Sequence, residues 1–565
     1  MSPPDRPNGE YRRAQPEGTP MSPTNSLPAI SAEAVHEQLR ARREVALIDV
    51  REEDPFAQQH PLFAAQLSAG RIELDAPWRL PRRDAPIVVY DDGEGLAVPA
   101  ALRLQSLGYS QVHLLDGGLA GWRDSGGELF RDVNVPSKAF GELVEHEVGT
   151  PSLPAEEVKA LLDAGTDLVV LDARRFDEYH TMSIPQGTSV PGAELVLRVR
   201  DLAPNPATRV IVNCAGRTRS LIGAQSLVNA GIPNPVAALR NGTIGWTLAG
   251  FALEQGQARR FGAVAPGNQA LARAAAQSLA DRAGAIRLDA ADLARWAADT
   301  GRTLYCWDVR TPEEYAAGHL PGFGSAPGGQ LVQETDVFAA VRGARLVLAD
   351  DDGVRAPMTA HWLAQLGWEV AWLTETPPGG FTEIGAWRPA HAALPAVQGV
   401  SAPELQALLA RQAVSVIDLN SHAQHAKGHV PGAWWALRSQ LGQALQAVQT
   451  VQAVPHALPQ NGLPLVLTCS DGRLSRFAAL DLRSMVDQPV QVLDGGTAAW
   501  VATGLPLETG AQRLASPAID RYRRPYEGTD NPRVAMQAYL DWEYGLVAQL
   551  ARDGTHCFRV LAPEA

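Results

Sequence analysis

One of the four cysteines in the chain, Cys214, lies where a strand-like segment gives way to a helix-like one. The apolar run Val210–Val212 predicts a buried strand before it, and the apolar spacing over Leu221–Leu227 predicts a helix after it. Backbone N–H groups converge at the start of a helix, where the helix dipole also favours negative charge. With Arg217 and Arg219 close in sequence, we expect the pKa of the Cys214 thiol to fall and the loop to attract anions. The pattern predicts an activated nucleophile, against the alternative of a cysteine that packs as a small apolar side chain.

The segment around Cys214 belongs to a unit that occurs four times along the 565-residue chain. In each unit a helix-like segment precedes an apolar run that ends in an aspartate. The residue after a second apolar run follows that aspartate by 42 positions in the first three units and by 51 in the fourth. The aspartates are Asp49, Asp172, Asp308 and Asp418, and the later residues are Asp91, Cys214, Asp350 and Cys469. We expect the nine additional residues of unit four in the Gln-rich segment 439–452.

A glycine-containing turn and a tryptophan close three of the four units. The glycines suit a turn after a third strand, and the tryptophan is typical of a core anchor on the short helix that follows. The tryptophans are Trp122, Trp246 and Trp500, whereas unit three keeps only a remnant of the motif with Trp387. Strands that alternate with helices within about 110 residues predict parallel α/β domains.

Together these motifs resemble the rhodanese family of sulfurtransferases. The resemblance rests on the Asp-x-Arg after the first strand, the His-x-Pro-Gly turns at 319–322 and 429–432, the strand, cysteine, loop and helix around Cys214, and the Asp-Gly-Gly and Trp closure. It covers residues 28–510 as four tandem modules. It implies that each module is a small α/β domain with a central parallel sheet flanked by helices.

The expected domain plan places four rhodanese-like domains between a leader and a tail. An Ala-rich pattern predicts a helix over 268–283, in the joint between domains two and three. The tail is basic and aromatic at 521–526 and then has an amphipathic helical pattern over 532–552. We expect this helix to pack on the domains, with a homodimer through the tail as the alternative. The plan comprises a disordered leader at 1–26, domains at 27–130, 151–258, 284–391 and 398–508, and a tail at 509–565.

The loops after the second strand decide which domains can do chemistry. Domains one and three have Asp91 and Asp350 in place of the cysteine, and a carboxylate cannot carry a transferable sulfur. We therefore expect both domains to be catalytically silent. A metal site at Asp350–Asp352 is the less favoured alternative, because contiguous acids on a loop are usually solvated.

The loop of domain four keeps a thiol but differs in charge from that of domain two. Cys469 is followed by Asp471 and Arg473, so we expect a weaker positive field than in domain two, whose loop has two arginines and no acid. Domain four is predicted to be a second active site, a relay site or a weak one.

The resemblance implies a sulfurtransferase that works by double displacement. The Cys214 thiolate would take the sulfane sulfur of thiosulfate or a similar donor and pass it to cyanide or a thiol acceptor. A scaffold that senses persulfide or oxidant without turnover is the alternative, and a cysteine phosphatase is disfavoured because the sixth residue after the nucleophile is a serine where such enzymes need an arginine. We expect the donor and the persulfide to be bound by Ala215, Gly216, Arg217, Thr218, Arg219 and Ser220 in domain two, and by Arg473 in domain four.

Charge and cysteine content exclude several other classes of protein. The formal net charge of −13 argues against a binder of nucleic acids or anionic membranes, because binding phosphates needs a basic surface. Four scattered cysteines suit neither a disulfide framework nor a metal site, so we expect no metal, no cofactor and a reducing cytoplasm. Cys306 and Cys557 are expected to be packed. The sequence contains no apolar run of about 18 residues, so no membrane span is expected.

Overall fold

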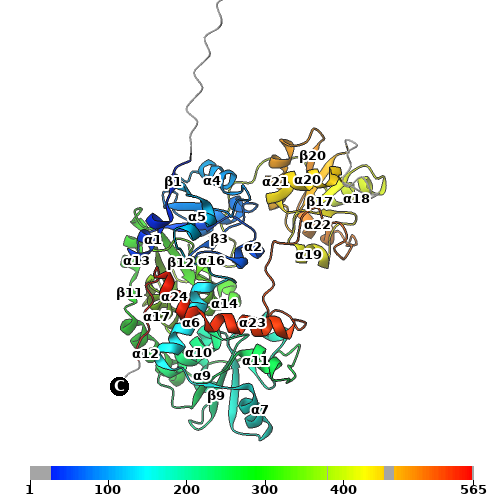
Figure 1. Cartoon of the computed structure of the whole chain (residues 1–565). Helices are drawn as coiled ribbons and strands as arrows, with labels where there is room; N and C mark the ends of the chain where they lie inside the picture. Colours follow the sequence, from blue (N-terminus) through cyan, green and yellow to red (C-terminus); the bar gives the residue numbers. More distant parts are fainter. Residues whose placement is uncertain (1–26, 378, 451–462, 563–565) are drawn as a thin grey trace, which may run out of the picture.

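The computed structural model describes residues 27–377, 379–450 and 463–562 (Figure 1). The predicted disordered leader at 1–26 lies outside the described residues, as does the end of the segment 439–452 that was expected to hold the additional residues of domain four. Within the described part, no helix combines the length and the apolar character needed to cross a membrane.

The described residues form four five-stranded sheets with one strand order. Counted within each domain, the order is 1-5-4-2-3, and the neighbouring strands are parallel. A parallel sheet is covered by helices on both faces, which explains why its central strands are continuous apolar runs. The predicted fold class of four tandem α/β domains with parallel sheets is therefore confirmed.

The four domains repeat one succession of strands and helices. Domain one contains β1 (Ala29–Ile30), α1 (Ala32–Arg40), β2 (Ala46–Asp49), α2 (Glu53–Gln58), β3 (Ala65–Gln66), α3 (Ile72–Arg79), β4 (Ile87–Tyr90), α4 (Ala97–Ser106), β5 (Val112–Leu115) and α5 (Gly118–Asp124). Domain two contains β6 (Ser152–Leu153), α7 (Ala155–Asp163), β7 (Leu168–Asp172), α8 (Phe176–Thr181), β8 (Thr188–Ser189), α9 (Leu195–Leu202), β9 (Arg209–Asn213), α10 (Thr218–Asn229), β10 (Val236–Leu239) and α11 (Gly242–Leu248). Domain three contains β11 (Ile286–Leu288), α13 (Ala290–Ala298), β12 (Leu304–Asp308), α14 (Pro312–Ala317), β13 (Gly324–Ser325), α15 (Gly328–Gln333), α16 (Thr335–Phe338), β14 (Arg345–Ala349), α17 (Arg355–Gln365) and β15 (Glu369–Leu373). Domain four contains β16 (Gly399–Val400), α18 (Ala402–Ala410), β17 (Ser415–Asp418), α19 (His422–Lys427), β18 (Trp434–Trp435), α20 (Leu441–Thr450), β19 (Leu465–Thr468), α21 (Arg473–Arg483), β20 (Val490–Leu493) and α22 (Gly496–Ala502).

The closing helix and its tryptophan are present in three domains. Trp122, Trp246 and Trp500 lie on α5, α11 and α22 and are buried, as predicted. In domain three the described residues after β15 form no such helix, and Trp387 packs instead against Trp307 and Trp78.

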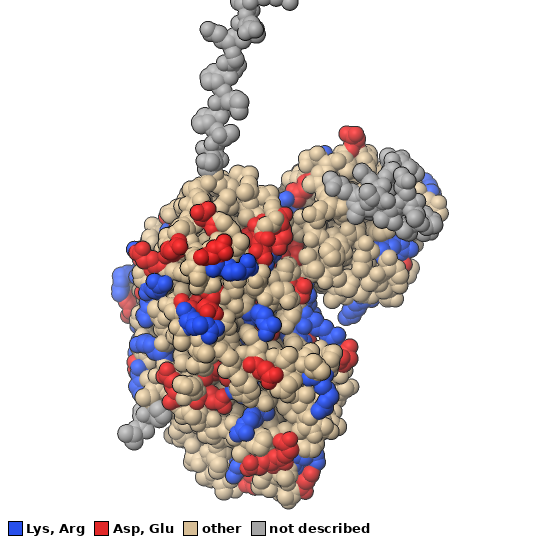
Figure 2. Space-filling view, in the orientation of Figure 1, with Lys and Arg blue, Asp and Glu red and all other residues tan. Residues whose placement is uncertain are grey.

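Two long helices join the first three domains. The helix α6 (Val135–Val148) links domains one and two, and α12 (Pro266–Ala283), predicted from the Ala-rich pattern, links domains two and three. Domains one and three share one apolar core, and α12 packs on α17. Domain four stands beside domain one (Figure 1). Arg438 of domain four forms an ion pair with Glu73 of domain one at 2.6 Å. Acidic and basic side chains are interspersed over the face shown in Figure 2.

The tail returns from domain four to the other domains (Figure 1). The predicted single helix over 532–552 is divided into α23 (Arg533–Tyr544) and α24 (Leu546–Asp553), which meet at Gly545, a residue of poor helix propensity. The apolar side of α23 is buried against domain two and that of α24 against domain one. Packing on the domains is therefore confirmed. The apolar face proposed for a homodimer is covered within one chain.

Candidate active sites

In domains one and three an aspartate side chain fills the start of the helix that follows the loop. The Asp91 carboxyl group accepts hydrogen bonds from the backbone N–H groups of Leu96 at 2.5 Å and Ala97 at 3.0 Å. The Asp350 carboxyl group accepts one from Ala356 at 2.8 Å. Each loop thus satisfies its helix-start amides with its own side chain, which occupies the position that an anionic substrate would take.

In domains two and four a cysteine takes the place of this aspartate. The Sγ of Cys214 lies 3.3 Å from the Oγ of Ser220, and the Sγ of Cys469 lies 3.7 Å from the Oγ of Ser475. Each serine stands six residues after its cysteine and donates to a loop carbonyl oxygen. The backbone N–H of Ser220 also hydrogen-bonds to the Cys214 sulfur. In both loops the sulfur atom therefore lies beside a serine in the first turn of the following helix, although the backbone before that helix differs, with φ of −120° at Arg217 and +82° at Gly472.

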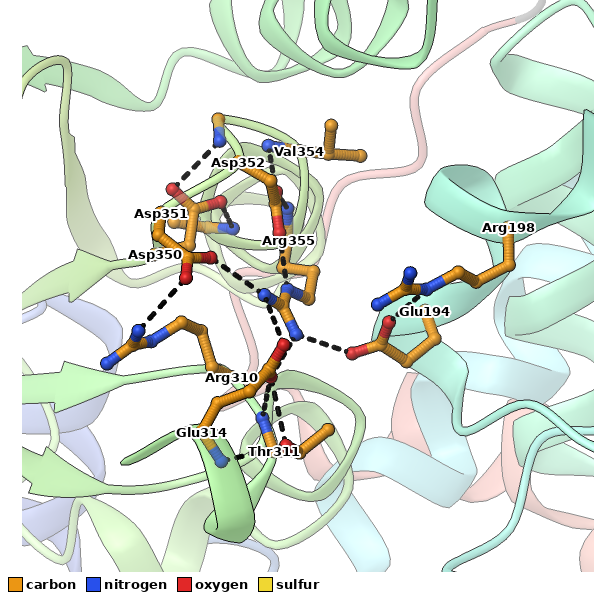
Figure 3. Close-up of polar contacts among 12 residues, drawn as sticks. Glu194, Arg198, Arg310, Thr311, Glu314, Asp350, Asp351, Asp352, Val354 and Arg355 are labelled. Carbon is orange, nitrogen blue, oxygen red and sulfur yellow. Dashed lines mark hydrogen bonds and ion pairs between the residues drawn. The ribbon is translucent and has the colours of Figure 1, made fainter. Parts of the chain in front are cut away.

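Arg355 closes the loop of domain three (Figure 3). Its buried guanidinium binds carboxylates from domains two and three. These partners are Glu194 at 2.8 Å, Glu314 at 2.6 Å, Asp351 at 2.9 Å and Asp352 at 2.6 Å. Asp351 also pairs with Arg310 at 3.1 Å. The acids of this loop are engaged by arginines and amides, which argues against the alternative of a metal site.

Arg217 is engaged by acidic and polar side chains of the chain itself. Its guanidinium is buried and forms ion pairs with Glu142 of α6, at 2.6 Å, and with Glu145. It also donates to Asn241 at 3.1 Å and to the Tyr544 hydroxyl at 2.9 Å. All five N–H groups of the guanidinium are thereby engaged. Since α6 and the tail bring these partners from outside domain two, the predicted contact of Arg217 with the donor or persulfide would require some of these bonds to break.

Arg219 keeps the predicted relation to the thiol. Its guanidinium forms a two-pronged ion pair with Glu178, with N–O distances of 2.7 and 2.9 Å. Partial desolvation acts to raise the pKa of Glu178, but the pairing with Arg219 outweighs it and lowers this pKa to about 2. The charge of Arg219 also acts to lower the pKa of the Cys214 thiol. Arg219 is therefore the arginine of this loop that remains placed to act on the sulfur.

The pKa of the Cys214 thiol is nevertheless raised, contrary to the predicted fall. Burial is the main cause, since Cys214 is 1% exposed and a thiolate loses its water there. Arg219 and Ser220 oppose this rise without outweighing it, and the nearby carboxylate of Glu543 adds to it. The wholly cationic surround expected from the sequence is not present.

The tail helix α23 covers the loop of domain two. A Cβ atom added at Gly216 would lie 3.0 Å from Cε1 of Tyr539 and 3.3 Å from Oε2 of Glu543. The Oγ1 of Thr218 lies 3.5 Å from Oε1 of Glu543, and Ala215 packs in one apolar cluster with Tyr539. The amphipathic pattern over 532–552 predicted a helix with Tyr539 on its buried side, but it did not indicate that Tyr539 lies against the Cys214 loop. The sequence did not indicate Glu543 as a residue of the site.

Two cavities approach the cysteine loops. One, of about 680 Å³, lies between domain two, the tail and domain four, and reaches Arg219 and Glu178. The other, of about 290 Å³, lies between domains one and four and is lined by Arg71 of α3 and by Leu474 of the Cys469 loop. Each cavity thus reaches a residue near one of the two cysteines, although neither cysteine lines it.

Arg473, the residue of domain four that is predicted to bind the donor, has its charge partly neutralised by an acid of its own loop. Its guanidinium pairs with Asp471 at 2.6 Å, and 40% of its side chain is exposed. The charge of Arg71, from the silent domain one, also interacts with Cys469. The weaker cationic field expected from the sequence of this loop therefore has a contribution from a second domain that the sequence did not indicate.

The remaining candidate side chains are structural. Asp172 and Arg174 form a buried ion pair at 2.7 Å at the end of β7, as expected for a carboxylate at a strand end. Cys306 lies on β12, where burial raises its pKa to about 12. Cys557 is partly buried in the tail.

Replacing the two arginines of the domain two loop in turn tests which of them acts on the thiol. In Arg219→Gln we expect the pKa of Cys214 to rise by about one further unit, because a nearby cation is lost. In Arg217→Gln we expect this pKa to stay nearly unchanged. The pH dependence of iodoacetamide alkylation, read at the Cys214 peptide by mass spectrometry, measures both. Equal shifts in the two variants would contradict the assignment.

Glu543 should make the stability of the tail contact depend on pH. Burial raises its pKa to about 8, although Lys138 acts in the opposite direction. Between about pH 4.5 and pH 8 the folded chain keeps a proton that the unfolded chain has lost, so stability should fall by up to about 1.4 kcal/mol per pH unit. Glu543→Gln should remove this fall, and Asp541→Asn, at an exposed position of α23, should retain it. Hydrogen exchange of α23 at pH 5 and pH 8 measures the difference, and an unchanged pH dependence in Glu543→Gln would contradict it.

Comparison with known proteins supports a sulfurtransferase. The family model described as "Rhodanese-like domain" matches residues 31–125, 154–249, 289–383 and 401–503. A thiosulfate sulfurtransferase of Azotobacter vinelandii is 27% identical over 216 residues, which cover 35% of this chain and 79% of that protein. A thiosulfate sulfurtransferase of Pseudomonas aeruginosa is 32% identical over 161 residues, which cover 25% of this chain and 58% of that protein.

A solved structure extends the similarity to nearly the whole chain. The crystal structure of a thiosulfate sulfurtransferase from Pseudomonas aeruginosa is 63% identical, with a TM-score of 0.92 over 95% of this chain and 100% of that one. Four matched domains, four sheets of one topology and the loop geometry agree. The chain belongs to the rhodanese family.

Proposed function

We propose that the protein is a thiosulfate sulfurtransferase that carries sulfane sulfur as a persulfide on Cys214 and on Cys469. One observation carries this proposal. At the loop position where the silent domains place an aspartate on the amides of the next helix, domains two and four place a cysteine sulfur. That position combines a nucleophile with hydrogen-bond donors for an anion.

The reaction consists of two displacements at sulfur. The cysteine thiolate attacks the outer sulfur of thiosulfate, a bond forms between the two sulfur atoms, and the electron pair of the broken S–S bond leaves with sulfite. An acceptor, cyanide or a thiolate, then attacks the outer persulfide sulfur, and the electron pair returns to the cysteine as a thiolate. Loop amides over 215–220 and the Arg219 guanidinium stabilise the negative charge in domain two, as Arg473 does in domain four.

Mass analysis of the protein treated with thiosulfate tests the proposal. We expect the intact chain to gain up to two sulfur atoms, which peptide mapping places on Cys214 and Cys469. Each serine variant should lose one of them, and cyanide should remove both. A protein that gains no sulfur, or gains it equally after both cysteines are replaced, would contradict the proposed function.

The burial of Cys214 favours a second candidate function for that site. A 1% exposed thiol with a raised pKa reacts slowly, so a persulfide on Cys214 would be loaded and unloaded slowly, which favours a persulfide sensor without turnover over a fast transferase. Persulfide that forms on Cys214 without turnover in Cys469→Ser would support the sensor. Steady thiocyanate production by that variant would support the transferase.

A further inference from the structure

Cys214 and Cys469 are both buried, at 1% and 4% exposure, but the two residues that follow each cysteine differ in exposure. In domain two, Ala215 and Gly216, which follow the cysteine, are both buried. In domain four, Ser470 and Asp471 stand at the same two positions, and both are exposed. In domain two, another segment of the chain lies over these two residues.

The tail lies above the loop of domain two. Tyr539 and Glu543 of α23 contact Gly216, as described above, and both side chains are buried. The Oε1 atom of Glu543 accepts hydrogen bonds from the Tyr539 hydroxyl at 2.7 Å and from the Thr218 hydroxyl at 3.5 Å, whereas its Oε2 atom is buried without a hydrogen-bond partner.

The tail is fastened to α6 at this point. Lys138 is 2% exposed, pairs with Asp132 at 2.8 Å, and lies 5.1 Å from the ring centroid of Tyr539 and 5.5 Å from that of Trp542. Cation–π contacts of a desolvated lysine hold the two rings in place. The helix α23, which covers the Cys214 loop, is therefore held in place by contacts with α6.

We propose that α23 restricts Cys214 to small substrates, with Tyr539 as the specificity-determining residue, and that Cys469 exchanges sulfur with the thiols of other proteins. The inference rests on the proposed function and names the acceptor class of each site. The cavity of about 680 Å³ admits a small anion or thiol as far as Arg219. A protein thiol has to bring its sulfur within about 3.5 Å of the persulfide while carrying its own backbone with it. At Cys214 the tail occupies that space, and at Cys469 the following loop residues face solvent.

The transfer to a protein acceptor is the second displacement of the proposed cycle. The acceptor thiolate attacks the outer sulfur of the Cys469 persulfide, the bond between this sulfur and Sγ breaks, and its electron pair stays on Cys469 as a thiolate. The acceptor leaves as a persulfide. No oxidant or reductant is required.

Alkylation tests whether α23 limits access to Cys214, and it does not depend on sulfur transfer. The full chain is treated with iodoacetamide or with a maleimide that carries a polyethylene glycol chain, and labelling is read at each cysteine peptide. We expect iodoacetamide to label both cysteines and the bulky maleimide to label Cys469 at least about tenfold faster than Cys214. Labelling of both cysteines by the bulky reagent at equal rates would overturn the proposal.

Three variants show whether Tyr539 is responsible. Tyr539→Ala should open Cys214 to the bulky reagent, and so should Gly216→Ala, which presses on Tyr539 from the side of the loop. Val534→Ala, at a position of α23 that is 81% exposed, should leave the selectivity unchanged. Bulky labelling of Cys214 that stays slow in both opening variants would overturn the role of Tyr539.

The sulfur test uses the loaded protein with two acceptors. After treatment with thiosulfate, cyanide should unload both cysteines, whereas a small reduced protein with an exposed cysteine should unload only Cys469. In Tyr539→Ala the protein acceptor should also unload Cys214. Unloading of Cys214 by the protein acceptor in the unmodified chain would overturn the inference. Failure of thiosulfate to load either cysteine would instead count against the proposed function, and the alkylation result would still stand.

Discussion

A variant in which Cys214 and Cys469 are both replaced by serine should transfer sulfur from thiosulfate to cyanide at least about 10³-fold more slowly than the unmodified protein. A hydroxyl group is a weaker nucleophile than a thiolate and cannot hold the persulfide. Domains one and three offer no substitute, because Asp91 and Asp350 stand at the equivalent positions. The initial rate of thiocyanate formation measures the loss.

The single variants should divide the activity unequally. Cys214 is buried under the tail and has a raised pKa, so Cys214→Ser should keep the larger part of the turnover. Cys469→Ser should keep the smaller part. The charges of the two loops suggested that Cys214 is the more active cysteine, and the order expected here is the reverse. A double variant that retains the rate of either single variant would place the nucleophile elsewhere in the chain.

The fold was predictable because each of its determinants is local. The separation of 42 residues between the ends of two strands recurs in three domains, and the apolar runs that it connects become the central strands of three sheets. The tryptophans Trp122 and Trp246 anchor the predicted closing helices. These features depend on period, burial and turn chemistry, all of which leave a pattern in a single domain.

The electrostatics of the site were not predictable, because they depend on contacts between distant segments. Arg217 and Arg219 are two residues apart, yet one pairs with Glu142 of the joint helix and the other with Glu178 of its own domain. No spacing in the sequence indicates that Glu142, 75 positions earlier, reaches Arg217. The sign of a pKa shift follows from such pairings and from burial, so counting nearby arginines gave the wrong direction for Cys214.

Domains one and three, which have an aspartate in place of the cysteine, contribute side chains to the surroundings of the other two domains. Domain one supplies Arg71 to the cavity beside the Cys469 loop. Domain three is joined to domain two through Arg355, which takes Glu194 as a partner across the interface. Arg355 stands five residues after Asp350, as Arg219 does after Cys214, and both arginines pair with a glutamate six residues after the strand-end aspartate. An arginine at this position is thus present both in a loop with the cysteine and in a loop without it.

Arg355→Ala should therefore loosen the interface between domains two and three. The change removes the cation shared by Glu194, Glu314 and Asp352, of which Glu194 and Asp352 are buried. Leaving a buried charge without its partner costs about 3–5 kcal/mol. We expect the amides of α17 and of the turn Gly192–Glu194 to exchange hydrogen faster by the corresponding factor, while those of domain four stay unchanged. Local exchange is the appropriate measurement, because a chain of four domains has no single two-state free energy of unfolding.

Arg198→Ala is the matched control for Arg355→Ala. Arg198 also pairs with Glu194, at 2.9 Å, but its side chain is 12% exposed and makes no ion pair with domain three among the described residues. Its loss should affect exchange in α9 and leave α17 unchanged. If Arg355→Ala and Arg198→Ala speed exchange in α17 equally, the interface is held by apolar packing and the buried ion-pair cluster is not its main support. If Arg355→Ala alone does so, the closed loop of domain three acts as a joint that fixes domain two, and with it the loop of Cys214.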